Sequence, residues 1–417
     1  MQSSTRPPGT PTKFPDCFHF KSCLSGMLRL LLVLSVVVLF FGLRPTQAQN
    51  HKYKVLYSFV GPTGDGTAPG VLVREPNGTI YGTTTYGGLA YRGTVFELSP
   101  SGKESVLYNF NAGYGSWPNS LVPYEGKFWG ATTWGGAAGA GAIFRLDENG
   151  NEAVLYSFPR NAWPGLYLVD SQGMFYGTTL SGGTYGYGTV FKIDSSGHLA
   201  ILYSFTGGSD GRDPCCLVQD SSGSLYGYTS FPNSADSVFK LDSSGSFTTI
   251  YAFTGGADGY GPSAGPVLDS SGNLYGGTES GGTGDCHNIG CGVIFKLDPS
   301  GHETVLYNFT GLSSGVDPDW LIADARGNLY GTTWFGGDPN CGAHSYTPGC
   351  GVVFKLSASG KQSVLHVFHL PPDGQFPVFL MMDPAGDLYG MTFSGGDPAC
   401  KINDIWTGCG TVFKLTP

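Results

Sequence analysis

The stretch GLYLVDSQGMFYGTTLSGGTYGYGTVFKIDSSGHLAILYSF, Gly165 to Phe205, contains four short runs rich in β-branched and aromatic residues. The runs cover 166–170, 174–179, 188–194 and 199–205, and each is bounded by Gly, Ser or Asp. Such runs predict strands. The connections DSQG and DSSG predict tight turns, because Asp bonds the local backbone and Gly supplies a positive φ. We therefore expect four antiparallel strands, called a, b, c and d in chain order.

The same unit recurs along the chain, marked by three phrases that each occur seven times. Strand b carries an aromatic residue followed by Gly: Tyr81, Trp129, Tyr176, Tyr226, Tyr275, Tyr330 and Tyr389. Strand c carries an aliphatic residue followed by Phe: Phe96, Phe144, Phe191, Phe239, Phe295, Phe354 and Phe413. Strand d ends in Phe: Phe59, Phe110, Phe158, Phe205, Phe253, Phe309 and Phe368. The mean period is about 51 residues, which is typical of a repeat architecture.

A four-stranded antiparallel unit repeated seven times predicts an all-β protein, a seven-bladed β-propeller, as a single domain over residues 49–417. The repeats begin with a lone strand d, residues 51–59, and end with strands a, b and c, the last being GTVFKLTP from Gly410 to Pro417. Together these fragments complete one blade. We expect the N-terminal strand d to pair with the C-terminal strand c, because that closes the ring and leaves no open sheet edge.

The first 48 residues have the features of a signal peptide, with Arg29, an apolar run over 30–43 and a cleavage site after Ala48. Translation could instead start at Met27. The alternative to a signal peptide is that the apolar run stays uncleaved as an N-terminal membrane anchor. Cleavage would remove five basic residues and one acidic residue, leaving 17 Lys and Arg against 30 Asp and Glu, a net charge of −13. We expect an exported monomer, periplasmic or extracellular, with no membrane span after cleavage. We expect no nucleic-acid partner, because such an acidic surface repels phosphates.

Between about Lys54 and Leu415 the repeated pattern GTVFKLD, LYSFTGG, DG, P and LDSSGNLYGTT resembles the GloVer (Gloeobacter/Verrucomicrobia) tandem repeats of bacterial exported proteins. The resemblance covers essentially all of the expected mature chain. It implies an exported repeat protein and supplies no catalytic residues or cofactor. Members of the family carry C-terminal anchors, and we see no anchor after the last repeat.

The a–b and c–d turns are short, whereas the b–c and d–a loops are longer and more variable, so we expect function on the face that carries the long loops. Residues that break the repeat there are the candidate ligand-binding residues: Trp117, Trp134, Trp163, Trp334, Arg212 and His344. Exposed Trp side chains stack on sugars and anchor interfaces. The alternative is packing between blades for the tryptophans, Trp320 and Trp406 included, and solvated loop positions for Arg212 and His344.

The d–a loops also carry a recurring Asp-Gly before a Pro, with Trp117 and Trp163 interpreted as the residues in the corresponding place of two repeats. The Asp residues are Asp65, Asp210, Asp258 and Asp373. One interpretation is a ring of carboxylates around a ligand or cation. A repeated turn in which Asp caps the backbone is the preferred interpretation, because a feature shared by most repeats is usually structural.

Six cysteines form three close pairs in the last b–c loops: Cys286 and Cys291, Cys341 and Cys350, and Cys400 and Cys409. In an exported chain these predict three local disulfides. A metal site with His287 or His344 is the rival, but the spacings do not suit zinc, and we expect no metal. The redox state of the adjacent Cys215 and Cys216 stays open: they form either a vicinal disulfide or a mixture of free and buried thiols.

These features predict a binding module for a carbohydrate, a surface polymer or a protein, with no cofactor and no assignable catalytic residue. A propeller enzyme of the lyase, hydrolase or quinone-dependent type, with a site at the channel mouth, is the first alternative. Its site would require His287, His344, Arg212 and Asp338 to converge in space. A structural envelope protein is the second alternative, with the disulfide loops as stiff surface features.

Overall fold

The computed structural model describes residues 51–417 except 62, 112, 114, 160–161, 230–235, 287–288, 342–347 and 403–405. The chain divides into two units, residues 1–48 and 49–417, and every described residue belongs to the second. The predicted signal peptide, like His287 and His344, lies outside the described residues. Within the described part of the chain, no helix is long and apolar enough to cross a membrane.

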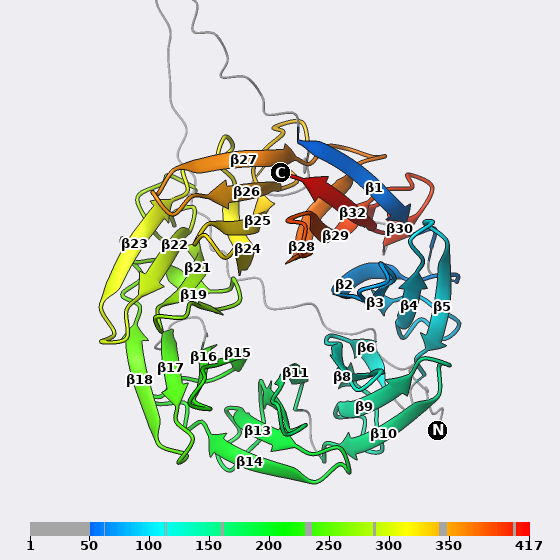
Figure 1. Ribbon diagram of the computed structural model, residues 1–417, viewed down its shortest axis with the longest axis horizontal. Coiled ribbons are helices and arrows are strands. Elements are labelled where there is room, and N and C mark those ends of the chain that lie inside the picture. The colour runs from blue at the N-terminus through cyan, green and yellow to red at the C-terminus, as the bar shows by residue number, and fades with distance from the viewer. Residues whose placement is uncertain are drawn as a thin grey trace, which may run out of the picture. The chain divides into compact units, whose positions relative to one another are not determined.

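The described strands form seven antiparallel sheets, the blades, arranged in a ring (Figure 1), so the predicted all-β propeller is confirmed. Blade 1 contains β2 (Thr67–Arg74), β3 (Ile80–Tyr86), β4 (Thr94–Leu98) and β5 (Glu104–Asn109). Blade 2 contains β6 (Ser116–Pro118), β7 (Val122–Tyr124), β8 (Lys127–Trp134), β9 (Ala142–Asp147) and β10 (Glu152–Ser157). Blade 3 contains β11 (Pro164–Val169), β12 (Phe175–Thr179), β13 (Thr189–Ile193) and β14 (Leu199–Ser204).

The remaining blades repeat this order. Blade 4 contains β15 (Pro214–Gln219), β16 (Leu225–Thr229), β17 (Ser237–Leu241) and β18 (Phe247–Ala252). Blade 5 contains β19 (Tyr260–Pro262), β20 (Val267–Leu268), β21 (Leu274–Ser280), β22 (Val293–Leu297) and β23 (Glu303–Asn308). Blade 6 contains β24 (Val316–Ala323), β25 (Leu329–Phe335), β26 (Val352–Leu356) and β27 (Gln362–Val367). In each blade strand a is innermost and strand d outermost (Figure 1).

Blade 7 joins the two ends of the second unit. It contains β28 (Gly374–Met382), β29 (Leu388–Gly395) and β32 (Thr411–Thr416), and β1 (Lys52–Ser58) completes it as the outermost strand. A small hairpin of β30 (Lys401–Ile402) and β31 (Trp406–Thr407) lies in its b–c loop. Val55 lies opposite Phe413, and Tyr57 lies opposite Val412. The predicted pairing of the N-terminal strand d with the C-terminal strand c is therefore confirmed.

Two of the three repeated phrases are cross-strand partners within each blade. The Gly of strand b lies directly opposite the Phe of strand c, as with Gly177 and Phe191. A Cβ added to Gly177 would come 2.5 Å from the ring of Phe191, so only glycine leaves room for this ring. The same close approach occurs in all seven blades, at Gly82, Gly130, Gly177, Gly227, Gly276, Gly331 and Gly390.

The third phrase joins neighbouring blades. The Phe that ends strand d packs edge-to-face on the strand c Phe of the next blade, as Phe205 does on Phe239 at a centroid distance of 5.4 Å. Seven such pairs complete the ring, including Phe59 on Phe96 at 5.2 Å. Aromatic pairs of this geometry stabilise beyond the area that they bury. The contact between blades 7 and 1 therefore matches the other six.

Candidate functional site

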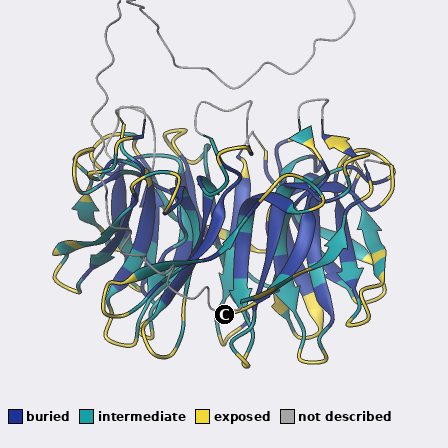
Figure 2. Ribbon diagram, turned by 90° about the horizontal axis from the view of Figure 1, so that it is seen from above, coloured by how far each residue is buried: buried dark blue, intermediate teal, exposed yellow. Residues whose placement is uncertain are grey.

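The two faces of the ring differ in their exposed apolar side chains. Exposed residues lie mainly in the connections at both faces, while the strands between them are mostly buried or half-buried (Figure 2). Ten large hydrophobic side chains are exposed among the described residues, and nine lie in b–c or d–a loops: Val60, Leu89, Tyr91, Trp163, Tyr185, Tyr187, Ile289, Leu312 and Leu370. The tenth, Ile201, lies on β14. The exposed apolar side chains of the described residues therefore lie mainly on the predicted long-loop face.

Three of the predicted binding residues meet in one row on this face. Trp117 contacts Tyr86 with ring centroids 5.4 Å apart, and Trp134 follows at 6.2 Å. Trp163 continues the row at 6.0 Å from Trp134, and 36% of its surface is exposed. We call Tyr86, Trp117, Trp134 and Trp163 the aromatic row. It runs from blade 1 to blade 3 along the ends of strands a and b.

The b–c loop of blade 3 and the following d–a loop extend this surface toward blade 4. Arg212 lies over the ring of Tyr187, 6.0 Å from its centroid. Tyr185 is 58% exposed and lines a cavity of about 890 Å³ with Tyr156, Phe158 and Ala162. Tyr86, Tyr185 and Tyr187 were not among the predicted binding residues. The pattern Tyr-Gly-Tyr inside a loop that is otherwise rich in Gly was the available signal for the last two.

Trp334 lies in a different group, in blades 6 and 7. Its ring stacks on Phe376 at 5.6 Å and also contacts Phe393. Trp406 packs against both phenylalanines, at 5.0 and 5.9 Å. Phe376 is fully buried, so this group contributes to packing between blades. Trp320 lies within β24 and packs on Phe379 of blade 7 at 4.7 Å, in agreement with the alternative of packing between blades.

The recurring Asp of the d–a loops caps the local backbone, which supports the structural interpretation. Asp210 accepts hydrogen bonds from the Tyr203 hydroxyl at 3.1 Å and from the Thr206 amide at 2.8 Å. Asp258 repeats this arrangement with Tyr251 and Thr254. Burial alone would raise the pKa of Asp210, but these hydrogen bonds hold it below its usual value.

The expected correspondence between these Asp residues and Trp117 and Trp163 is wrong. Each Asp lies four residues before the repeated Pro, whereas each Trp immediately precedes it. Trp117 and Trp163 have φ values of 60° and 49°, and they match Ala68, at 53°, in the first repeat. The backbone amide of Trp117 donates to Arg92 O in the neighbouring blade, as that of Ala68 does to Cys409 O. The fold fixes the backbone here and leaves the side chain free to vary.

The three predicted disulfides are present, between Cys286 and Cys291, Cys341 and Cys350, and Cys400 and Cys409. Their Cα atoms lie 5.1 to 5.6 Å apart, within the normal range. Each closes a b–c loop on the long-loop face. No group of three or more His, Cys, Asp or Glu side chains is placed to hold a metal ion in the described part of the chain.

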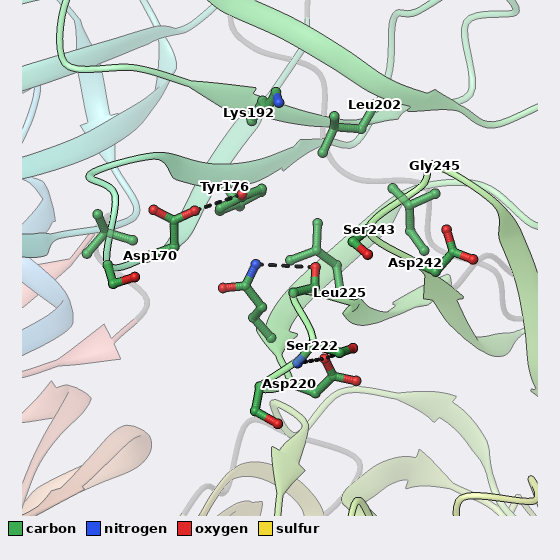
Figure 3. Close-up of a pocket in the computed structure, with 16 residues that line it drawn as sticks. Asp170, Tyr176, Lys192, Leu202, Asp220, Ser222, Leu225, Asp242, Ser243 and Gly245 are labelled. Atoms are coloured by element: carbon green, nitrogen blue, oxygen red, sulfur yellow. Dashed lines mark hydrogen bonds between the residues drawn. The ribbon is translucent and has the colours of Figure 1, made fainter.

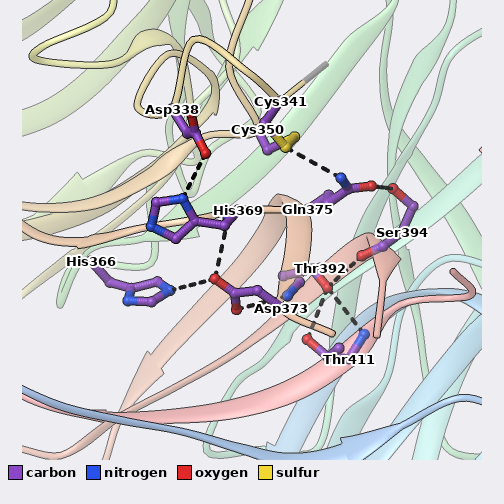
Figure 4. Close-up of polar contacts among 11 residues, drawn as sticks. Asp338, Cys341, Cys350, His366, His369, Asp373, Gln375, Thr392, Ser394 and Thr411 are labelled. Atoms are coloured by element: carbon purple, nitrogen blue, oxygen red, sulfur yellow. Dashed lines mark hydrogen bonds and ion pairs between the residues drawn. A yellow bond between two sulfur atoms is a disulfide. The ribbon is translucent and has the colours of Figure 1, made fainter. Parts of the chain in front are cut away.

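The described members of the hypothetical enzyme site do not converge. Asp338 pairs with His369 of the next d–a loop, Oδ2 to Nδ1 at 2.8 Å (Figure 4). Arg212, in contrast, lies in the d–a loop that leads into blade 4. Asp373 accepts from the His369 amide and lies 3.2 Å from His366 Nε2. His366 occupies the place of Tyr203, so it belongs to the capping arrangement. His287 and His344 lie outside the described residues.

A cavity of about 600 Å³ lies on the opposite face, between the short turns of blades 3 and 4 (Figure 3). Its carboxylates already stabilise turns: Asp170 accepts from the amides of Gln172 and Met174 and from the Tyr176 hydroxyl. The Asp220 turn is built in the same way. This cavity therefore follows from the repeated turns, and we do not take it as the site.

Acidic side chains approach one another where blades 5 and 6 meet near the centre of the ring. Burial, with the charges of Glu279 and Asp319, raises the pKa of Asp317. Burial, with the charge of Glu279, raises the pKa of Asp319 to about 7. A carboxyl whose folded-state pKa exceeds its unfolded value of about 3.9 binds its proton more tightly in the folded state. Its stabilising contribution is complete below pH 4 and is lost as the pH rises through 7.

The variant Asp319→Asn is therefore expected to be more stable than wild type at pH 8, and this advantage should be smaller at pH 5 by about 2 kcal/mol. The gain arises because Asn needs no proton to lie next to Glu279. Urea unfolding at the two pH values measures the difference. An equal gain at both pH values would show that titration of Asp319 is not the cause.

Comparison with known proteins agrees with this architecture. A model of the Gloeobacter/Verrucomicrobia repeat matches residues 39–235 and 163–396. No curated protein matches the sequence at a significant level. Virginiamycin B lyase from Staphylococcus aureus is similar in structure, with a TM-score of 0.59 and 16% identity over 88% of this chain and 99% of that one. Its catalytically inactive variant with quinupristin gives a TM-score of 0.58 at 17% identity, with the same coverage of both chains.

An extracellular domain assigned to a one-component system of B. thetaiotaomicron is also similar. It gives a TM-score of 0.54 and 14% identity, over 88% of this chain and 41% of that chain. At these identities the similarity shows a shared fold.

Proposed function

The chain belongs to the Gloeobacter/Verrucomicrobia repeat family, and we propose that it is an exported module that binds a neutral carbohydrate polymer on its long-loop face. The aromatic row is the observation that carries this proposal. Tyr86, Trp117, Trp134 and Trp163 follow one another at 5.4 to 6.2 Å, so a linear polymer can meet several rings in succession. Aromatic side chains combine an apolar face with a polar edge, which suits sugars.

The charge of the chain favours a neutral polymer over an acidic one. Residues 49–417 carry 17 basic and 30 acidic side chains, so polyanions are repelled. Three disulfides in loops fit an oxidising, extracytoplasmic compartment. The structural relatives include an extracellular domain and a propeller crystallised with quinupristin, so related rings face the cell exterior or hold ligands. Lyase activity in that relative does not transfer at 17% identity.

A panel of immobilised neutral polysaccharides tests the proposal. We expect the wild type to bind at least one of them, and the double variant Trp117→Ala, Trp163→Ala to bind it at least tenfold more weakly, a loss of about 1.4 kcal/mol or more. Ile201→Ala is the matched control, because it removes an exposed apolar side chain that lies off this face. Equal affinity of wild type and double variant, or no polysaccharide bound by wild type, would refute the proposal.

A further inference from the structure

The innermost strand of blade 4 carries two adjacent cysteines, Cys215 and Cys216, on β15. They are free thiols, whereas the other six described cysteines form the three loop disulfides. Both side chains are half-buried. Neither thiol belongs to the long-loop face or to the turns, so the proposed function does not use them.

The backbone at Cys216 places the two thiols next to each other. In a regular strand successive side chains point to opposite faces, which would separate adjacent sulfur atoms. Here the pairing register shifts between Cys215 and Val218, and Cys216 has a φ of 65°. The two side chains consequently hydrogen-bond to each other.

This left-handed residue is specific to blade 4. The corresponding residues of blades 1, 6 and 7 are Val71, Trp320 and Phe379, and none of them has a positive φ. Unlike the left-handed residues that immediately precede the repeated Pro, such as Ala68 and Trp117, Cys216 has no left-handed counterpart in the other repeats. The repeat therefore does not require this left-handed conformation. The conformation is local to blade 4, and it brings the two thiols together.

Cys216 is reachable from a cavity of about 460 Å³ among the innermost strands of blades 3 to 6, and Cys215 is itself partly exposed. Cys216 lines this cavity together with Tyr167, Val267 and Trp320. The Cys216 thiol donates a hydrogen bond to Cys215, and this bond together with burial raises the pKa of Cys216. This thiol therefore reacts best as the second, intramolecular partner, where proximity compensates for a small thiolate fraction.

We propose that Cys215 and Cys216 are a reversible oxidation site that closes to a vicinal disulfide. With glutathione disulfide as oxidant, the Cys215 thiolate attacks one glutathione sulfur and releases one glutathione. The Cys216 thiol then loses its proton to solvent, attacks the Cys215 sulfur and releases the second glutathione. The protein loses two protons and two electrons as one disulfide breaks and another forms.

This bond should differ in kind from the loop disulfides. A disulfide stabilises more when it closes a longer loop, and adjacent cysteines close the shortest loop possible. Strained disulfides are also reduced more readily than structural ones. The site therefore responds to redox conditions under which the three loop disulfides stay closed.

A redox titration of the wild-type protein tests this inference. The folded protein is equilibrated at graded ratios of reduced to oxidised glutathione, quenched, alkylated, digested with trypsin and weighed by mass spectrometry. The tryptic peptide 213–240 contains Cys215 and Cys216 and no other cysteine. Peptides 241–296 and 327–355 contain the first two loop disulfides, and peptides 362–401 and 402–414 are joined by the third.

We expect peptide 213–240 to carry the disulfide when oxidised glutathione predominates. This disulfide should be reduced at a ratio of reduced to oxidised glutathione at least about tenfold lower than the ratio that reduces the other three bonds. Cys216→Ser is the matched variant, and it should end as a mixed disulfide of Cys215 with glutathione. The proposal would be overturned if both thiols of the wild-type protein were alkylated at every glutathione ratio, or if they formed only mixed disulfides with glutathione. Opening together with the loop disulfides would overturn it as well.

Discussion

A chain of residues 60–417 is expected to lose cooperative folding, while a chain of residues 49–417 keeps it. The missing segment contains β1, which forms the outer strand of blade 7 and pairs with β32 through six residues. It also contains Phe59, whose ring packs on Phe96 and whose amide donates to Gly410 O at 3.0 Å. Loss of the strand leaves β32 unpaired on its outer side, so β32 becomes the edge of blade 7.

The expected loss is comparable to the whole stability of a domain, about 5 kcal/mol or more. Thermal unfolding followed by circular dichroism measures it, and size-exclusion chromatography detects aggregation through the open edge. A synthetic peptide of residues 51–59 should restore folding, because an added strand can complete an unpaired sheet edge. An unchanged melting transition for residues 60–417 would show that the ring does not depend on this strand.

The second large effect is expected from Gly177→Val, which should destabilise the protein by about 3 kcal/mol. A Cβ at this position would lie 2.2 Å from Gly165 O and 2.5 Å from the Phe191 ring. Neither neighbour can move easily, because Phe191 also packs on Phe158 of the preceding blade at 5.7 Å.

Gly265→Ala is the matched control for this variant. A Cβ on Gly265 meets nothing within 4 Å, and its φ is not in the left-handed region. Urea unfolding should give a free energy within about 0.5 kcal/mol of wild type for this control. Equal effects of the two substitutions would show that the Gly–Phe pairing does not carry the predicted cost.

The fold was predictable because the same physical contact is repeated seven times. The Gly of strand b and the Phe of strand c recur at a fixed spacing because one makes room for the other, as at Gly177 and Phe191. The Phe that ends strand d recurs because it joins each blade to the next. The incomplete repeats at residues 51–59 and 410–417 then predict where the ring closes.

The site was only partly predictable, because the loops do not obey the repeat. The loop lengths predicted that Trp117, Trp134 and Trp163 lie on the long-loop face. They could not show that the three rings meet in a row. Tyr86 was missed because it lies at the end of a strand whose other residues are repetitive. The wrong match of Trp117 to the recurring Asp arose because the d–a loops offer few fixed residues for alignment.

The central claim is that the long-loop face of blades 1 to 4 binds the ligand. Hydrogen–deuterium exchange, with and without the polysaccharide that the panel selects, tests it most directly. The account predicts slower exchange on binding in loops 85–93, 133–141 and 180–188, and unchanged exchange in turns 170–174 and 194–198. Protection confined to those turns, or absent from all three loops, would contradict it.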